Sequence, residues 1–394
     1  MNLFPMNQPT LALSISEDAL CLVGVKKSWR TTSLQQVKQV SLPAGVIQLS
    51  SAKPNILNME AFVEQLRILF ETCQQPISIA LSLPDLCART CAFDFTKFPT
   101  KPSEQTALLN WRFKQDLKLD TTLSRLAYQV YVPTSLANSS THDNSETVRV
   151  LGTVIRNEIV EQFESACLDA NLIPASVSIA GLDIFDFYQQ NIQEILKADD
   201  KHDSVSSTGA MFLFMSHWGF TFFACNDGCP TFVRTKAIPI RPTVNREPAN
   251  DSLGRQENQE DVAHNQVDSM QSTFASIDEQ AAERVITPYP SETMTKVENE
   301  ILATLQYYLE TFSQDGATSS STHLFFVTDL EHGHMLLPTS DHIQQTAQVS
   351  GLTTSPIQFT QFSYTTQFKS RGSRSIQESN IWSALSGYAS LRVA

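Results

Sequence analysis

The sequence predicts an α/β protein made of two related lobes, and two observations support this prediction. The chain has 394 residues, which is long enough for two domains of ordinary size. Each half also opens with a strand, a short turn and a second strand, at residues 11–25 and again at residues 211–225. This duplicated opening, followed in both halves by strands and helical patterns, indicates two similar α/β units.

Composition and charge exclude several classes of protein. Hydrophobic residues make up 41% of the chain, which is enough to form folded cores. The net charge of −13 and the pI of about 5.1 argue against binding to nucleic acids or anionic membranes, since both require basic surfaces. No apolar run approaches the ~20 residues of a membrane span, and residues 1–10 lack a signal-peptide pattern. We therefore expect a cytoplasmic protein without direct membrane insertion, whose seven cysteines are reduced thiols.

The first half continues with a helix and a strand. Asn58 is a suitable N-cap for a helix over residues 59–73, in which apolar residues recur at helical spacing. Residues 77–83 alternate between apolar and small polar side chains, as in a half-buried strand, and the pattern stops at Pro84. A separate block then contains strands at 88–95, 126–132 and 148–154 and helices at 103–117 and 156–170.

This block divides the first domain. We interpret residues 86–172 as a small α+β subdomain inserted into a first domain that comprises residues 1–85 and 173–196. A helix within residues 379–394 is a candidate to return to this first domain. The second domain is expected over residues 205–240 and 292–378, with a helix at 297–312 and a buried strand at 323–328. Residues 241–291 are polar and acidic with few large apolar side chains, which predicts a flexible insertion.

Five short motifs, taken in order, carry a resemblance to a known family. They are Ile79–Asp85, the run from Asn171–Pro174 through Leu182–Phe187, Asp227–Arg234, Glu300–Tyr307 and Ala384–Arg392. Their order and spacing resemble the PilM-type proteins of type IV pilus assembly, whose relatives serve MSHA pili and type II secretion. The resemblance implies an actin-like two-domain fold with an inserted small subdomain. It also implies a partner, the short cytoplasmic tail of a bitopic inner-membrane protein similar to PilN.

The same resemblance implies where a nucleotide would bind, because two hairpin turns of this fold cradle the phosphates and an aspartate in each holds the metal. Such turns need glycine or small residues, so that backbone N–H groups can approach phosphate oxygens. In the first turn the family's aspartate corresponds to Ser14, its glycine to Ser16 and its small hydroxyl residues to Glu17 and Asp18. In the second turn the aspartate corresponds to Phe214 and the glycine lies near Ser216, while His217 and Trp218 fill the turn. A glycine pair that would face adenosine corresponds to Asp329 and Leu330. We therefore expect no phosphate binding of the usual kind and no ATPase activity.

Two further groups of residues have alternative interpretations. Asp329, Glu331, His332 and His334 are potential metal ligands, but a solvated loop is the favoured interpretation because their spacing matches no closed metal site. The helix at 103–117 carries Leu108, Trp111, Arg112 and Lys114, an aromatic and basic set typical of protein-binding surfaces. These residues are candidates for partner binding, although Trp111 is equally compatible with packing inside the inserted subdomain.

The function predicted from the sequence is therefore that of a scaffold. It would bind a PilN-like tail at a groove between the first domain and the inserted subdomain, and would reach the inner membrane through that partner. No catalytic residue, cofactor or metal is expected. Two alternatives stay open, an actin-like ATPase that binds Mg-ATP through altered turns and a filament-forming actin-like protein. The sequence does not decide which pilus or secretion system is served, whether the chain binds other pilus-assembly proteins, or whether it self-associates.

Overall fold

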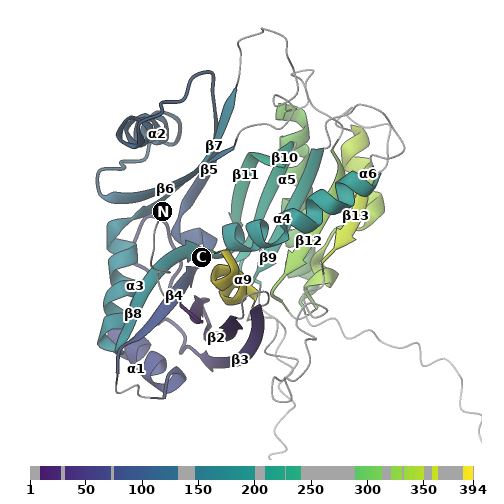
Figure 1. Cartoon of the computed structure of the whole chain (residues 1–394). Coiled ribbons are helices and arrows are strands. Elements are labelled where there is room, and N and C mark those ends of the chain that lie inside the picture. Colours follow the sequence, from purple (N-terminus) through teal and green to yellow (C-terminus); the bar gives the residue numbers. More distant parts are fainter. Residues whose placement is uncertain are drawn as a thin grey trace, which may run out of the picture.

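The computed structural model describes residues 9–27, 32–71, 75–131, 147–199, 209–226, 228–240, 289–312, 321–330, 332–349, 357–362 and 385–393 (Figure 1). The predicted insertion at 241–291 lies outside these residues except for its last three positions, as does Glu331. Within the described segments, no helix combines the length and the apolarity needed to cross a membrane.

The first lobe is built on a five-stranded sheet in the order β3-β2-β1-β4-β8. Its strands are β1 (Leu11–Ile15), β2 (Ala19–Lys27), β3 (Thr32–Ser41), β4 (Ile77–Leu83) and β8 (Leu172–Ile179). The first three strands form an antiparallel meander, whereas β4 runs parallel to both β1 and β8. Because β8 pairs only with β4, it forms one edge of the sheet.

The second lobe repeats this topology in the order β11-β10-β9-β12-β13. Its strands are β9 (Gly209–Ser216), β10 (Gly219–Asn226), β11 (Cys229–Ala237), β12 (Ser321–Thr328) and β13 (Gln358–Gln361). Again the first three are antiparallel, and β12 is parallel to β9 and β13. The duplicated meander with two added parallel strands confirms the predicted α/β fold class, which is actin-like.

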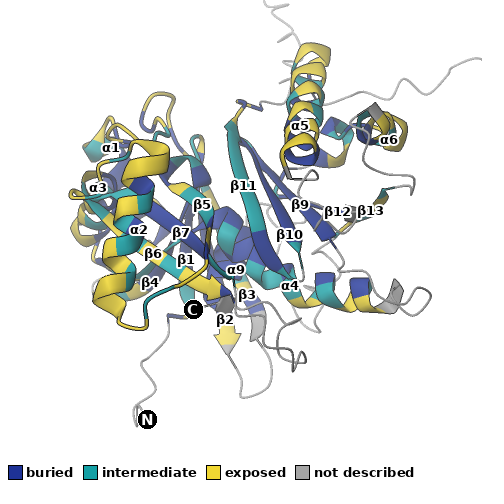
Figure 2. Ribbon diagram, turned by 90° about the horizontal axis from the view of Figure 1, so that it is seen from above, coloured by how far each residue is buried: buried dark blue, intermediate teal, exposed yellow. Residues whose placement is uncertain are grey.

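Helices cover both sheets. On the first lobe, α1 (Met59–Leu69) and α3 (Asn157–Asp169) bury their apolar sides against the sheet, and Phe62 meets Phe163 at 6.0 Å between ring centroids. On the second lobe, α5 (Ser291–Phe312) and α6 (Ser340–Val349) pack on the sheet and leave their outer sides exposed (Figure 2). Two short 3₁₀ turns follow strands of the two sheets: η1 (Asp85–Cys87) comes after β4, and η3 (Gly333–Leu336) comes after β12.

Two further helices belong to a core that the two lobes share. They are α4 (Ala180–Asp199) and α9 (Leu385–Val393), which pack against each other and against strands of both sheets. Within this core, the ring of Phe185 stacks on Phe223 at 4.8 Å, and Phe187 meets Tyr388 edge to face at 5.7 Å. The α9 helix lies against β1, β2 and β4 of the first lobe. The lobes are therefore joined through packed helices as well as by the connecting chain.

A third, smaller sheet lies between β4 and β8 in sequence, in the order β5-β7-β6 (Figure 1). It contains β5 (Arg89–Phe95), β6 (Ser124–Tyr131) and β7 (Val148–Arg156), and α2 (Pro102–Leu117) covers one face. Phe113 of α2 meets Phe93 edge to face at 5.0 Å, and Gly152 leaves room for it, since a Cβ there would lie 2.9 Å from the Phe113 ring. Although α3 lies inside the predicted 86–172 insertion, its buried side contributes to the core of the first lobe. The predicted domain boundaries remain predictions.

Candidate binding groove and interlobe cleft

The two hairpin turns singled out from the sequence face each other across a cleft between the lobes. Ser14, Ser16 and Asp18 line it from the first lobe, and Ser216, His217, Trp218 and Asp329 line it from the second. The structure thus brings most of the predicted nucleotide positions together, whereas Phe214, Leu330 and Glu17 do not line the cleft. We call this space the interlobe cleft. Its volume is about 40 Å³.

The first turn is closed by its own side chains. The Ser16 backbone N–H donates to the Ala19 carbonyl at 2.9 Å, and the Ala19 N–H donates to the Ser16 hydroxyl at 3.0 Å. The same hydroxyl donates to the Asp18 carboxylate at 2.7 Å. Behind the turn, Ser14 is buried and its hydroxyl shares a 2.5 Å hydrogen bond with Ser386 of α9. Serine hydroxyls thereby occupy positions where the turn would otherwise present backbone groups to a ligand.

The second turn is filled by aromatic rings. Phe214 is fully buried, and Trp218 is 4% exposed and meets it edge to face at 6.3 Å. Gly219 follows with a φ of +139°, and a Cβ at this position would lie 2.0 Å from the Lys236 carbonyl oxygen. Only glycine fits this backbone, because an L side chain would collide with the neighbouring strand. The glycine therefore serves the packing of β10 on β11.

Asp329 follows β12 and is half-buried where it lines the cleft. One of its carboxylate oxygens accepts a hydrogen bond from the Ser216 hydroxyl at 2.9 Å, and the other has no partner among the described residues. Burial raises the pKa of Asp329 to about 6 and Asp18 adds to the shift, while His217 and the Ser216 hydroxyl oppose it. The next residue, Leu330, belongs instead to the core of the second lobe.

The size and lining of the interlobe cleft limit what it can hold. A water molecule needs roughly 10–15 Å³ of such volume, and pockets for small organic ligands usually measure roughly 300–1,000 Å³. The 40 Å³ cleft therefore has room for a few waters, and a nucleotide does not fit unless Trp218 and the turns move. Acidic groups at Asp18 and Asp329 would also repel phosphate.

A much larger cavity, of about 560 Å³, lies between the first lobe and the small sheet. It is bordered by β6 and β7 on one side, by β8 on the other, and by α3 and the start of α4 (Figure 1). We call it the β6–β8 groove. Its lining is largely apolar and includes Leu126, Leu151, Ile155, Val160, Pro174, Val177 and Leu182. This volume falls within the range of sites that bind organic ligands or short peptide segments.

Both long walls of the groove are edge strands. Among the described residues, β6 pairs with β7 alone and β8 pairs with β4 alone. An edge strand carries backbone N–H and C=O groups that point away from its own sheet, and an added strand can pair with them. Pro174 interrupts β8 near a register irregularity beside Ile79, which is a common feature of strands at an edge.

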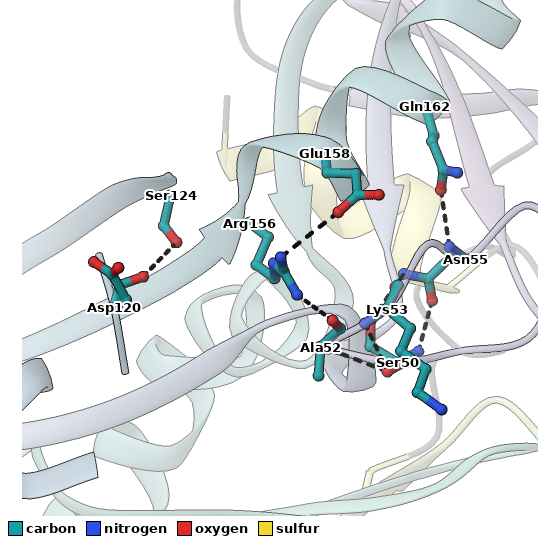
Figure 3. A network of polar contacts seen from close by, with 9 residues as sticks. All are labelled: Ser50, Ala52, Lys53, Asn55, Asp120, Ser124, Arg156, Glu158 and Gln162. Carbon is teal, nitrogen blue, oxygen red and sulfur yellow. Dashed lines mark hydrogen bonds and ion pairs between the residues drawn. The ribbon is translucent and has the colours of Figure 1, made fainter. Parts of the chain in front are cut away.

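The wall formed by α3 is held in place by a polar network (Figure 3). Gln162 of α3 accepts hydrogen bonds from the backbone N–H of Asn55 at 2.8 Å and of Ile56 at 3.3 Å. Arg156, at the end of β7, pairs with Glu158 at 3.6 Å and donates to the Ala52 carbonyl. These bonds fix the junction between β7 and α3 against the loop that precedes α1.

Charged groups in the groove are few and unevenly distributed. Arg125 of β6 and Glu164 of α3 form a two-pronged ion pair, with contacts of 2.6 and 2.8 Å. Asp183 and Asp186 lie on the first turns of α4, and Asp183 accepts a hydrogen bond from Ser178 at 2.5 Å. Burial raises the pKa of Asp183 to about 8 and that of Asp186 to about 6. Both carboxylates lie in the Leu182–Phe187 motif, which sequence reasoning had noted without assigning these residues a role.

The predicted partner-binding residues of α2 do not line the groove. Trp111 is 56% exposed, and Lys114 is also exposed. Arg112 pairs with Asp116 at 2.9 Å and lies over the Phe93 ring at 5.4 Å, while Leu108 packs beside it in the α2 core. On β7, Val150 and Val154 face α2, whereas Leu151 and Ile155 face the groove. Alternate residues of a strand point to opposite faces, so α2 and the groove lie on opposite sides of the small sheet.

The described residues among the potential metal ligands, Asp329, His332 and His334, do not form a metal-binding cluster. The His332 and His334 rings lie 6.3 Å apart between centroids, beside η3. Within the described segments, no group of three or more histidine, cysteine, aspartate or glutamate side chains has the arrangement of a metal site.

Comparison with known proteins gives a likeness of fold rather than of sequence. No protein-family model matches the chain, and no curated protein matches it in sequence. Among solved structures, the PilM-PilN type IV pilus biogenesis complex aligns with a TM-score of 0.61 and 13% identity, over 98% of this chain and 97% of that one.

Two more distant structures align less well. An actin-like ATPase-fold protein of unknown function from Bacteroides thetaiotaomicron gives a TM-score of 0.40 at 8% identity, with 93% and 97% of the two chains covered. The cytoplasmic domain of EpsL, from the type II secretion system of Vibrio cholerae, gives 0.38 at 9% identity, with 91% of each chain covered. The fold of this chain is actin-like, and a chain of the PilM-PilN type IV pilus biogenesis complex is one of the solved structures that it resembles.

Proposed function

We propose that this chain is a cytoplasmic scaffold of a type IV pilus or related secretion machinery, which binds the tail of a PilN-like inner-membrane protein in the β6–β8 groove. The observation that carries the proposal is the contrast between the two cavities. The groove measures about 560 Å³, whereas the interlobe cleft measures about 40 Å³. The fold resembles a chain solved in the PilM-PilN complex, which supports a partner of the PilN kind.

The groove suits an extended peptide segment better than a compact ligand. It lies between two edge strands, so the backbone of a bound segment can pair with strand groups while apolar side chains enter the lining. A flexible tail loses conformational entropy when it is bound, but it can contact a long surface. Only the part of the tail that lies inside the groove needs to become ordered. The partner would hold the scaffold at the inner membrane.

The same contrast supports a function without nucleotide hydrolysis. The phosphate turns are occupied by serine hydroxyls and aromatic rings, and the carboxylates of Asp18 and Asp329 border the remaining space. Isothermal calorimetry with Mg-ATP tests this proposal, and we expect no heat of binding at millimolar nucleotide. Binding in the micromolar range would instead support the alternative of an ATPase with altered turns.

Calorimetric titration of a synthetic PilN-like tail into the full-length chain tests the proposed partner. Groove-filling variants Ala127→Arg on β6 and Ser176→Arg on β8 should abolish binding, because both residues line the groove. Trp111→Ala, on the opposite side of the small sheet, is the matched control and should leave binding unchanged. A loss of binding in the control with none in the groove variants would transfer the site to α2, and no binding by the wild-type chain would overturn the proposal.

A further inference from the structure

One carboxylate in the β6–β8 groove lacks a counter-charge. Asp186 lies on α4 and lines the groove, and it forms no hydrogen bond or ion pair with any described residue. The groove-lining cation Arg125 is engaged by Glu164, and Arg149 nearby is engaged by Asp94 at 2.7 Å. A partly buried, unpaired charge is costly, so its retention at a binding surface calls for an explanation.

The neighbours of Asp186 are acidic or neutral. Asp183 lies one helical turn earlier, is 6% exposed, and has a pKa raised to about 8 by burial, so it carries a proton at neutral pH. Burial raises the pKa of Asp186 to about 6, so this carboxylate is ionised at neutral pH. The buried Tyr131 hydroxyl has no hydrogen-bond partner in the described part of the chain, and its pKa is raised by burial and by Asp186. Asp186 is therefore the unbalanced negative charge of an otherwise apolar groove.

We infer that the β6–β8 groove selects a segment with a positively charged group, which pairs with Asp186 while apolar side chains of the segment contact Leu151, Ile155 and Val177. This inference rests on the proposed function and specifies the chemistry of the bound tail. The pair would form in a partly desolvated site, where a charge-assisted hydrogen bond is stronger than in water. The chain's net charge of −13 also favours the approach of a cationic segment.

The cation can come from a side chain of lysine or arginine or from the free N-terminal amine of the tail. Three peptides of the same apolar sequence separate these sources. One carries a lysine and a free amine, one has the lysine replaced by norleucine, and one has the amine acetylated. We expect one of the two replacements to weaken binding to the wild-type chain by at least about tenfold, which identifies the cationic group.

Asp186→Asn tests the acceptor, and Asp169→Asn, at the exposed C-terminal turn of α3, is its matched control. Asp186→Asn should weaken the peptide that carries both cationic groups by at least about tenfold and leave the peptide that lacks the identified cationic group unaffected, whereas Asp169→Asn should change neither. Equal binding of all three peptides to the wild-type chain would overturn the inference while sustaining the proposed function. If no peptide binds, the proposed function itself fails.

Titration of the wild-type chain at several pH values adds a test that needs no variant. The titratable and charged groups around Asp186 are Asp183, which also interacts with Asp85, and Tyr131 of β6, whose pKa is raised by burial and by Asp186; the Arg125–Glu164 pair lines the same groove. With a peptide free of histidine and carboxylate side chains, affinity should rise between pH 5 and pH 7 as Asp186 ionises. Affinity that is flat or falls over this range would count against Asp186 as the acceptor.

Discussion

The carboxylate of Asp85, at the end of β4, accepts a hydrogen bond at 2.9 Å from the hydroxyl of Thr221 on β10. Its second oxygen accepts a bond at 2.9 Å from the backbone N–H of Gly181, at the start of α4. Asp85 is 5% exposed, so both bonds are shielded from water. One buried side chain thus connects the first sheet, the shared helix α4 and the second sheet, at the boundary where the small sheet is inserted.

Asp85→Ala should lower the free energy of unfolding by about 2–4 kcal/mol, because it leaves the Gly181 N–H and the Thr221 hydroxyl buried without acceptors. Gly181→Ala should cost a similar amount, since its Cβ would lie 2.2 Å from the Asp85 carboxylate and displace it. The double variant should lose less than the sum of the two, because removing the carboxylate makes room for the new methyl group. Chemical unfolding curves measure all three values, and strict additivity would contradict this account.

The buried carboxyl groups make stability depend on pH in an unusual direction. Burial raises the pKa values of four aspartates above the unfolded value of about 3.9, to about 6 for Asp85, Asp186 and Asp329 and to about 8 for Asp183. At pH values between the unfolded pKa and the folded pKa of each group, the folded chain binds more protons than the unfolded chain, so the free energy of unfolding falls as pH rises. A group whose pKa is raised by about two units lowers the free energy of unfolding by up to about 3 kcal/mol once the pH exceeds its folded pKa. We expect a lower unfolding free energy at pH 8 than at pH 5, measured by denaturant titration.

Asp329→Asn provides the control for this pH effect. The amide keeps the size of the side chain but cannot ionise, so the variant should lose less stability between pH 5 and pH 8 than the wild-type chain does. Asp341→Asn, at an exposed position on α6, should keep the wild-type slope. A wild-type unfolding free energy that increases over this range would show that these carboxyl groups are not raised as described.

Alanine substitutions at Gly45 and Gly219 distinguish the cost of a steric collision from the cost of backbone strain. Gly219 and Gly45 both have positive φ, +139° and +80°, but a Cβ at Gly45 would meet no atom within 4 Å, whereas one at Gly219 would lie 2.0 Å from a backbone oxygen. Gly45→Ala should therefore cost about 1 kcal/mol from strain alone. Gly219→Ala should cost more than about 3 kcal/mol, because β10 and β11 must separate as well. Equal losses in thermal unfolding would show that the β10–β11 register adapts.

Local patterns predicted most of the strands and helices, but not the helix α4. The strand–turn–strand openings of both lobes lie where alternation and turn residues indicated, because hairpin signals depend on neighbouring residues. The α4 helix was not predicted, although it spans Ala180–Asp199 and joins both lobes. Its buried residues Ile184, Tyr188, Ile192 and Leu196 recur at helical spacing, so the pattern was present in the sequence although the aromatic residues Phe185 and Phe187 have only modest helix propensity. β8 spans Leu172–Ile179, where pairing with β4 outweighs the weak strand signal around Pro174.

The candidate site could be predicted only in part. A family resemblance placed the two turns of the interlobe cleft, and the structure brings them together with Asp329. The lining of the β6–β8 groove could not be read from the sequence, because residues such as Leu126, Ile155 and Val177 meet through long-range pairing of separate sheets. The exposed Trp111 drew attention to α2 because aromatic residues are frequent at interfaces, but alternation along β7 places α2 on the other face.

Asn55 offers a test of whether the α3 wall supports the groove. Its side chain is fully buried, accepts a bond from the Ser50 N–H at 2.6 Å and donates to the Ser50 carbonyl at 2.8 Å, so it closes the loop that holds Gln162 of α3 (Figure 3). Asn55→Ala should lower the unfolding free energy by about 2–4 kcal/mol, because buried backbone groups lose their partners. It should also weaken tail binding, since α3 lines the groove, whereas Lys53→Ala, an exposed change in the same loop, should alter neither property. Calorimetry below the unfolding midpoint distinguishes the two effects, and unchanged affinity in a destabilised Asn55→Ala chain would show that the groove does not depend on this anchor.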